Sequence, residues 1–305
     1  MTLGTNQFSS ATVVAMVPEV WSTMILEEMH AKAVASNFFT DLSSWVTNGG
    51  DTIHVPDVYT NTFTVQTQST QGTEVTLGYP AQVDVTLSTW LHKYIAFQIG
   101  DKELAQLSKS YDFNAVYARK ISESLIDALE TSIFGLWSGL TTNSVGDTAT
   151  VLSDAEIRQS IEKLAAGNFL LTECAWFIHP YVFWLQLGAI KKYYDMAQSG
   201  FKYVMEGNFG PMDASRGRQG TLYGIPIFVS TNVASGLQTY RNILAHKSAF
   251  GFAIQTPGGK DVRVQIENRL EFLSTVVVAD ILYTVGELRD GAAVVVNASS
   301  AFIGS

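Results

Sequence analysis

The chain has 305 residues, enough for one large domain or two interwoven ones, and it carries a net charge of −9. That charge argues against a protein that binds nucleic acid tightly, and the single cysteine, Cys174, excludes an intramolecular disulfide and a cysteine-based zinc site. No run of about 18 uncharged apolar residues is present, so no segment is predicted to cross a membrane. Only 15% of the residues are charged, against about 25% in ordinary soluble proteins. This deficit favours a surface used for protein contacts, with a neutral enzyme as the alternative.

Residues 1–16 carry no charge and are predicted to form a flexible arm. Pro18 begins a helix, because proline suits the first helical turn and Glu19 lies near the positive end of the helix dipole. The helix is expected to end near residues 36–37. Four residues then predict an apolar anchor: Phe38, Phe39, Leu42 and Trp45.

A threonine-rich stretch lies between Thr60 and Val83, where seven of 24 residues are threonine and the only charged residue is Glu74. Polar and apolar residues alternate on either side of a turn at 71–73, which predicts a two-stranded ribbon over about 52–87. Each arm of about 15 residues would reach about 50 Å, and such a ribbon is only marginally stable alone in water. With so few charges to protect its edges, the ribbon is expected to lie on another copy of the chain. Self-assembly is therefore our first functional hypothesis.

A strand is predicted from Trp90 to Ile99, then a short helix over 101–108, and then the longest helix, capped by Asp112 and ending near Trp137. At about 1.5 Å per residue this helix would run about 40 Å and serve as a spine. Its apolar face is marked at three- and four-residue steps by Phe113, Val116, Tyr117, Ile121, Leu125, Leu129, Ile133 and Trp137. Five polar residues are predicted to lie off that stripe: Asn114, Lys120, Glu123, Asp127 and Glu130.

The second half mixes helices with strands that are mostly not adjacent, so the predicted class is α+β. A capping box at 153–156 begins a helix that Gly167 ends, a buried strand follows over 170–177, and another helix is expected over 181–197. A glycine-rich loop over 200–220 precedes one strand over 221–229, interrupted by Gly224 and Pro226. Later strands are expected at 241–245, 249–255, 262–266, within 274–285, and at 292–297.

No catalytic or cofactor motif is recognisable. Ser138 sits one position too late for a Gly-x-Ser-x-Gly elbow, and neither a phosphate loop, a dinucleotide fingerprint nor a His-Glu-x-x-His motif occurs. The histidines are scattered singly along the chain: His30, His54, His92, His179 and His246. Cys174 lies in an apolar run and is interpreted as a buried structural thiol. We therefore predict no catalytic residue, no cofactor and no metal.

The order of elements is itself specific: flexible arm, helix, long ribbon, spine helix, and a globular half that closes with alternating strands. Together with several local motifs, this order resembles the major capsid proteins of tailed bacteriophages, which have the Hong Kong 97-type fold, over nearly the whole chain. The motifs are Val17–Trp21, Gly50–Pro56, Ile99–Gln106, Leu222–Ser230 and Arg289–Val294.

The resemblance implies an N-arm at 1–48, an extended loop called the E-loop at 49–95, and a peripheral domain at 96–150 and 241–275. It also implies an axial domain at 151–240 and 276–305, with strands shared with the peripheral sheet. In this family the E-loop lies across a neighbouring subunit. The expected inter-subunit contacts are Phe63, Val65, Gln66, Gln68, Gln71, Glu74, Leu77 and Tyr79.

The resemblance also implies a function. Pentamers and hexamers of such a coat protein close an icosahedral virion shell around double-stranded DNA, without sequence-specific binding, after assembly in the host bacterial cytoplasm. Because the chain lacks a long N-terminal scaffolding segment, a separate scaffolding protein is expected, together with a portal and no membrane. The alternatives are an encapsulin-like nanocompartment shell of the same fold, a tail or decoration protein, and an enzyme whose site only folding assembles.

Overall fold

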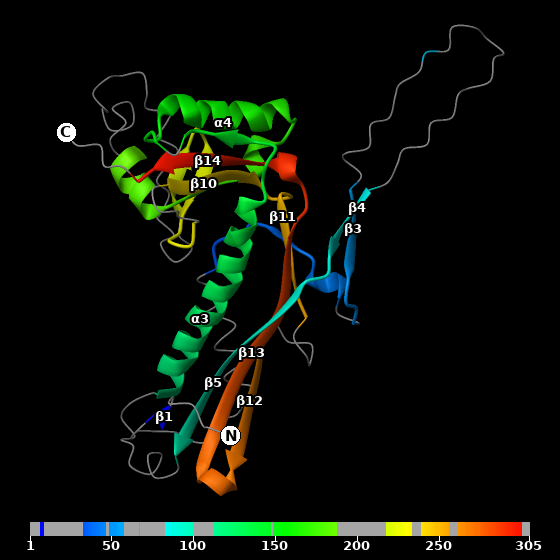
Figure 1. Cartoon of the computed structure of the whole chain (residues 1–305), viewed down its shortest axis with the longest axis vertical. Coiled ribbons are helices and arrows are strands. Elements are labelled where there is room, and N and C mark those ends of the chain that lie inside the picture. The colour runs from blue at the N-terminus through cyan, green and yellow to red at the C-terminus, as the bar shows by residue number, and fades with distance from the viewer. Residues whose placement is uncertain are drawn as a thin grey trace, which may run out of the picture.

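The computed structural model describes residues 7–8, 33–46, 49–57, 67, 83–100, 113–147, 149–187, 218–233, 239–255 and 262–300. These residues form two sheets, one above the other, with a long helix beside the lower one and a shorter helix over the upper one (Figure 1). A separate two-stranded ribbon stands beside them. The predicted α+β class is confirmed.

The two sheets and the ribbon account for all the strands described. The long sheet contains β1 (Gln7–Phe8), β2 (Thr40–Asp41), β5 (Trp90–Gly100), β11 (Phe250–Ile254), β12 (Arg263–Arg269) and β13 (Ser274–Glu287). The upper sheet contains β6 (Ser144–Val145), β7 (Cys174–Ile178), β8 (Arg218–Leu222), β9 (Ile225–Val229), β10 (Thr239–His246) and β14 (Ala293–Ser299). The ribbon consists of β3 (Ile53–Asp57) and β4 (Val83–Leu87).

Two α-helices lie among the described residues, α3 (Phe113–Gly135) and α4 (Asp154–Ala166). A π-helical turn spans Val182–Leu187. Short 3-10 turns lie at Ser43–Trp45, Leu136–Ser138, Leu171–Glu173, Leu270–Phe272 and Asp290–Ala292.

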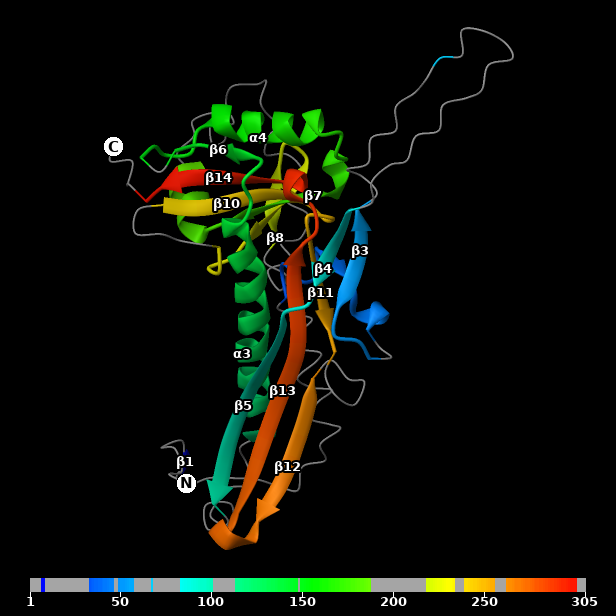
Figure 2. The same ribbon diagram turned by 45° about the vertical axis from the view of Figure 1, so that its right-hand side comes forward.

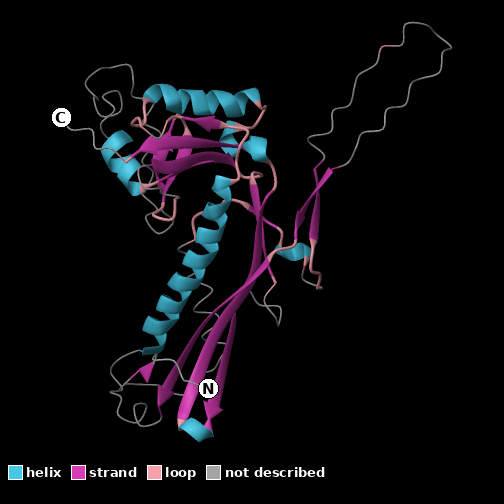
Figure 3. Ribbon diagram, in the orientation of Figure 1, coloured by secondary structure: helices cyan, strands magenta, loops and turns pink. Residues whose placement is uncertain are grey.

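The upper sheet has the strand order β6-β14-β10-β7-β9-β8 and lies beneath α4 (Figure 3). All five residues of β7 are buried, and successive side chains alternate between two cores. Trp176 belongs to the core on the α4 side, whereas Phe177 packs against Phe39, Phe134 and Trp137 on the other side. Burial on both faces therefore explains why β7 is apolar along its whole length.

The long sheet has the order β1-β5-β13-β11-β2, with β12 also paired to β13. α3 runs along one face of this sheet (Figure 2). On that face Val277, Ala279 and Ile281 are buried, and the Tyr283 hydroxyl donates to the Ala128 carbonyl at 3.1 Å. The alternate residues of β13 point to the opposite face, which we call the outer face.

The predicted spine helix is confirmed as α3, which continues through a 3-10 turn to Ser138. The predicted stripe is buried at Ile121, Leu125, Leu129, Ile133 and Trp137. The placement of Glu130 off that stripe is wrong: its side chain is buried and accepts the backbone N–H groups of Ala35 and Ser36. Because those donors lie about 95 residues away in the chain, helical spacing alone gave no sign of them.

The predicted start of α4 is confirmed by a complete capping box. The Ser153 hydroxyl accepts the Glu156 N–H at 3.4 Å, and the Glu156 carboxylate accepts the Ser153 N–H at 2.7 Å. Gly167 directly follows the last helical residue, as predicted, although the left-handed backbone falls on the next residue, Asn168, with φ of 59°. Asparagine tolerates this conformation better than most residues.

Two predicted strands have other boundaries. The strand expected over 170–177 begins at Cys174, because the preceding three residues form a 3-10 turn and Leu170 is 64% exposed. The single strand expected over 221–229 is a hairpin of β8 and β9. Its turn residues, Tyr223 and Gly224, both have positive φ, of 53° and 81°. This is the geometry of a two-residue hairpin turn.

The remaining strand predictions are confirmed at β5, β10, β11, β12, β13 and β14. Phe38, Phe39 and Leu42 pack into the cores as expected. Trp45 does not, because the 3-10 turn that it ends leaves it 57% exposed. β10 lies mostly in the range predicted for the peripheral domain and belongs to the upper sheet, whereas β13 lies mostly in the range predicted for the axial domain and belongs to the long sheet. The domain boundaries stay a prediction.

Several predictions fall outside the described residues. They are the body of the helix beginning at Pro18, the short helix over 101–108, the continuation of the 181–197 helix beyond Leu187, and the loop up to residue 217. The predicted end of the first helix near residues 36–37 is wrong, because residues 33–35 are not helical and residues 36–38 form only a turn. β8 includes Arg218–Gly220, so the predicted end of that loop at 220 is too late.

Candidate subunit interface

The foot of the predicted ribbon is confirmed. β3 and β4 pair antiparallel with Ile53 opposite Leu87 and Asp57 opposite Val83. The His54 Nδ1 and Asp84 Oδ2 atoms lie 2.7 Å apart across the strands, but both side chains are more than half exposed, so this hydrogen bond adds little stability. The eight predicted contact residues, Phe63, Val65, Gln66, Gln68, Gln71, Glu74, Leu77 and Tyr79, all lie outside the described residues. Their role stays a prediction.

The ribbon foot is held on the outer face of the long sheet by a small apolar cluster. Its buried members are Leu42, Val46, Ile53, Leu87 and Ala253. Gly286 of β13 makes room for this contact, because a Cβ there would lie 2.9 Å from the Leu87 Cγ. The Trp90 indole N–H also donates to the Asp51 carbonyl at 2.7 Å. The root of the ribbon is therefore fixed, whatever its far end contacts.

Below the ribbon foot, the outer face is partly open among the described residues. Tyr94 of β5 is 69% exposed, and Ala96 beside it is also exposed. Opposite them on β13, Asp280 pairs with Tyr94 and Val278 with Ala96, and Val278 is only half-buried. An exposed tyrosine beside half-buried apolar side chains has the composition of a protein interface.

A polar network crosses this outer face at Asp280. Arg263 of β12 donates two hydrogen bonds to the Asp280 carboxylate, at 2.9 and 2.8 Å, and His92 of β5 lies 2.8 Å from it. Burial opposes the charged form of Asp280, but the hydrogen bonds from Arg263 and His92 outweigh it and hold the pKa below its usual value. The network ties three strands together without an apolar residue.

The turn between β12 and β13 forms a protruding apolar tip. Leu270 is 84% exposed, Leu273 is 68% exposed and Phe272 is 45% exposed. Leu273 has a left-handed backbone with φ of 44°, which costs a leucine about 1–2 kcal/mol. A strained turn with three exposed apolar side chains is a second candidate contact surface. The only sequence signal was a segment with three large apolar residues, Leu270, Phe272 and Leu273, between two alternating strands.

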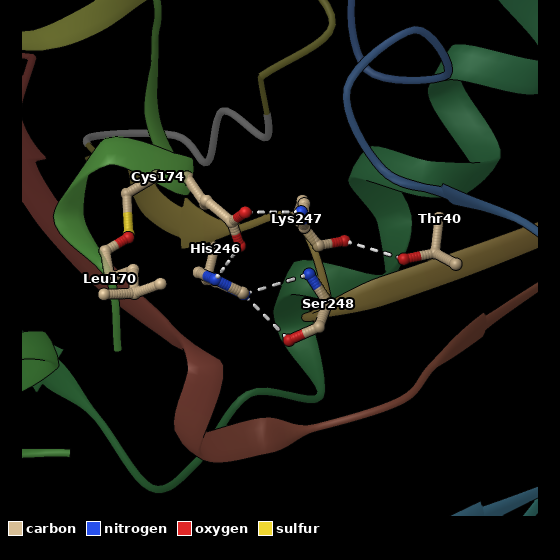
Figure 4. A network of polar contacts seen from close by, with 7 residues as sticks. Thr40, Leu170, Cys174, His246, Lys247 and Ser248 are labelled. Carbon is tan, nitrogen blue, oxygen red and sulfur yellow. Dashed lines mark hydrogen bonds and ion pairs between the residues drawn. The ribbon is translucent and has the colours of Figure 1, made fainter. Parts of the chain in front are cut away.

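A third polar cluster joins the two sheets where the chain passes from β10 to β11 (Figure 4). Glu173 accepts from Lys247 at 2.7 Å and lies 3.2 Å from His246. The Lys247 carbonyl accepts the Thr40 hydroxyl at 3.1 Å, which adds the N-terminal segment to this joint. Burial lowers the pKa of His246, so its neutral form is favoured and its ring nitrogen accepts the Ser248 N–H at 3.2 Å.

Cys174 lies beside this joint with its thiol against the Leu170 carbonyl, at 3.4 Å. Burial, with a smaller contribution from the charge of Glu173, raises the pKa of this thiol to about 11. The interpretation of Cys174 as a buried thiol is confirmed. A thiol with so high a pKa is a poor nucleophile.

Within the described ranges, no three His, Cys, Asp or Glu side chains gather as a metal site. The described helices include none with the length and apolarity needed to span a membrane. The described residues offer three candidate contact surfaces: the ribbon foot, the open outer face and the tip.

The architecture has clear counterparts among solved structures, although no protein-family model and no curated protein matches the chain. A chain of Mycobacterium phage Che8 matches with a TM-score of 0.66 and 17% identity, covering 95% of each chain. The mature capsid of bacteriophage PhiM1 matches with a TM-score of 0.61 and 16% identity, covering 97% of this chain and 91% of the other. The chain has the Hong Kong 97-type capsid fold.

In this Hong Kong 97-type fold, α3 is the spine helix and the β3–β4 ribbon is the root of the E-loop. The fold is not restricted to phage heads. The encapsulin complex of Synechococcus elongatus PCC 7942 matches with a TM-score of 0.63 and 11% identity, covering 97% of this chain and 95% of the other. At identities this low, the similarity lies in the path of the backbone and the order of the elements, and few side chains are shared.

Proposed function

We propose that this protein is the major capsid protein of a tailed bacteriophage, and that its copies assemble as pentamers and hexamers into an icosahedral shell around double-stranded DNA. The observation that carries the proposal is the Hong Kong 97-type fold along 95% of the chain, shared with phage particles. On this proposal the protein is structural and has no catalytic site, and its location is the virion.

The contact surfaces support assembly. The ribbon root is fixed to its own subunit at Gly286 and Leu87, while the outer face and the tip keep large apolar side chains exposed. We assign the upper sheet to the axial domain and the long sheet with α3 to the peripheral domain. A separate scaffolding protein, a portal and assembly in the host cytoplasm stay predictions.

Removal of residues 60–82 tests the proposal. We expect the shortened chain to keep its folded body but to form no shells, because the deletion takes the E-loop and leaves the root pairing of β3 and β4. Electron microscopy measures the number of shells. Amide hydrogen exchange at β10 and β14 shows whether the rest of the subunit is still folded. Normal shells from the deleted chain would refute the role of the E-loop.

A cellular nanocompartment shell is the second candidate, and the similarity to the encapsulin complex favours it. Electron microscopy separates the two when the full chain is expressed alone and again with a phage scaffolding protein. Uniform small shells from the chain alone, carrying a host protein, would favour the nanocompartment. Shells whose size depends on the scaffolding protein would favour the phage head.

A further inference from the structure

Segment 33–46, which we call the strap, crosses the molecule from α3 to the foot of the ribbon. Figure 1 shows it in blue beside the upper part of α3, passing to β3. Its start meets Glu130 of α3, its middle packs between the two sheets, and its end lies under the ribbon. The strap therefore contacts α3, both sheets and the foot of the ribbon.

The contact with α3 depends on one side chain. The Glu130 carboxylate accepts the Ala35 N–H at 2.9 Å, the Ser36 N–H at 3.0 Å and the Ser36 hydroxyl at 3.1 Å. The two N–H groups begin an isolated helical turn, in which Phe38 and Phe39 donate back to the Ala35 carbonyl. The first N–H groups of any helical turn have no acceptor within the turn, and here the Glu130 carboxylate supplies that acceptor.

The dependence is mutual, because both sides of the contact are buried. Glu130 is 4% exposed and Ala35 is 0% exposed. Burial raises the pKa of Glu130, while the N–H groups of Ser36 and Ala35 oppose that rise. Loss of the strap would leave a carboxylate without donors in the core, and loss of the carboxylate would leave two N–H groups without an acceptor.

The rest of the strap links this turn to the ribbon. Phe39 packs against Phe177 of the upper sheet and Phe250 of the long sheet, with ring centroids 5.3 and 5.0 Å apart. β2 of the strap then pairs with β11, and Leu42 packs with Leu87 in the cluster under the ribbon. The same turn of α3 is held from the sheet side, where Ser132 lies 2.8 Å from the Tyr283 hydroxyl.

We propose that Glu130 is a positioning residue for shell assembly, which clasps the strap to α3 and so fixes the direction in which the E-loop leaves the subunit. This inference rests on the proposed function. The buried Glu130 carboxylate would couple the spine helix to the E-loop within one subunit. This role is separate from any contact between subunits.

Glu130→Gln is the test, because it keeps the size of the side chain and replaces one acceptor oxygen with an N–H donor facing the Ala35 N–H. Glu123→Gln is the matched control, a more exposed glutamate on the same helix, bonded to Lys120. In Glu130→Gln we expect amide exchange at Ala35 and Ser36 to accelerate about tenfold or more, with faster exchange through β3 and β4. Exchange at β10 and β14 should stay unchanged, and the yield of closed shells should fall.

Three outcomes would overturn the proposal: unchanged exchange at Ala35 and Ser36, an equal acceleration everywhere in the protein, or normal shells from a variant with a loosened strap. If Glu130→Gln does not fold, Ser36→Ala removes only the hydroxyl bond and should give a smaller acceleration confined to the strap. Exchange is measured on unassembled protein. If the natural chain forms no shells, the proposed function fails, while the exchange result still decides whether Glu130 holds the strap.

Discussion

The upper sheet buries apolar side chains on both faces, whereas the long sheet buries one face and leaves much of the other exposed. All five residues of β7 are buried. In β5, by contrast, His92, Tyr94 and Ala96 share the outer face of the long sheet and are all exposed. The upper sheet is thus complete within one chain. The long sheet is stable on its α3 side and presents the outer face for contact with another molecule.

Phe177→Ala tests the complete side of this comparison and should have the largest effect on stability. The Phe177 ring is fully buried and contacts Phe38, Phe39, Phe134, Trp137 and Phe228. We expect the free energy of unfolding to fall by about 3–5 kcal/mol, measured by denaturant titration. Leu170→Ala is the control, and its 64% exposed side chain should change that free energy by less than about 0.5 kcal/mol. Equal losses in the two variants would contradict the two-faced core.

Gly286→Ala tests the boundary at which the ribbon foot covers the outer face. The added Cβ would lie 2.9 Å from Leu87 Cγ, so we expect a loss of about 1–3 kcal/mol and faster amide exchange in β3 and β4. Gly291→Ala is the control, since no atom lies within 4 Å of its new Cβ. In a double-mutant cycle, the losses from Gly286→Ala and Leu87→Ala should be less than additive, because truncation of the leucine removes the clash. If the two single glycine variants behave alike, the ribbon foot does not depend on this contact.

Tyr94→Ser tests the open side and should have the smallest effect on the isolated subunit. Because Tyr94 is 69% exposed, the free energy of unfolding should change by less than about 0.5 kcal/mol. Shell yield should nevertheless fall, since tyrosines are enriched among the few interface residues whose truncation costs about 2 kcal/mol or more. Lys93→Ser, at the neighbouring exposed position on the other side of β5, is expected to assemble normally. Unchanged shell yield in Tyr94→Ser would remove this face from the interface.

The sequence predicted most of the fold because its strongest patterns are local. The stripe from Ile121 to Trp137, the capping box at Ser153 and the alternating strands of the last third need no distant partner to be recognised. The hairpin at Tyr223 was missed because a tyrosine rarely occupies a left-handed turn position, so the run looked like one strand.

The candidate interface was predicted less completely, because its features depend on contacts between distant segments. The residues around Glu130 in the sequence do not indicate that it binds the strap, and the residues around Tyr94 do not indicate that its face of the sheet is exposed. In the sequence, the only sign of the tip is three large apolar residues within 270–273, a pattern that is equally typical of a buried turn. The alternating pattern predicted the ribbon, the resemblance identified it as an E-loop, and its predicted contacts lie outside the described residues.

Cys174 has a practical consequence for experiments on this protein. It is the only cysteine of the chain, it is buried, and with a pKa of about 11 only about one thiol in a thousand is ionised at pH 8. Thiol-directed dyes and spin labels should therefore not react with Cys174 on the timescale of ordinary labelling. The unmodified chain should therefore take up no such label. A single introduced cysteine can then be labelled selectively, and labels on neighbouring subunits can report the distances between them in an assembled particle.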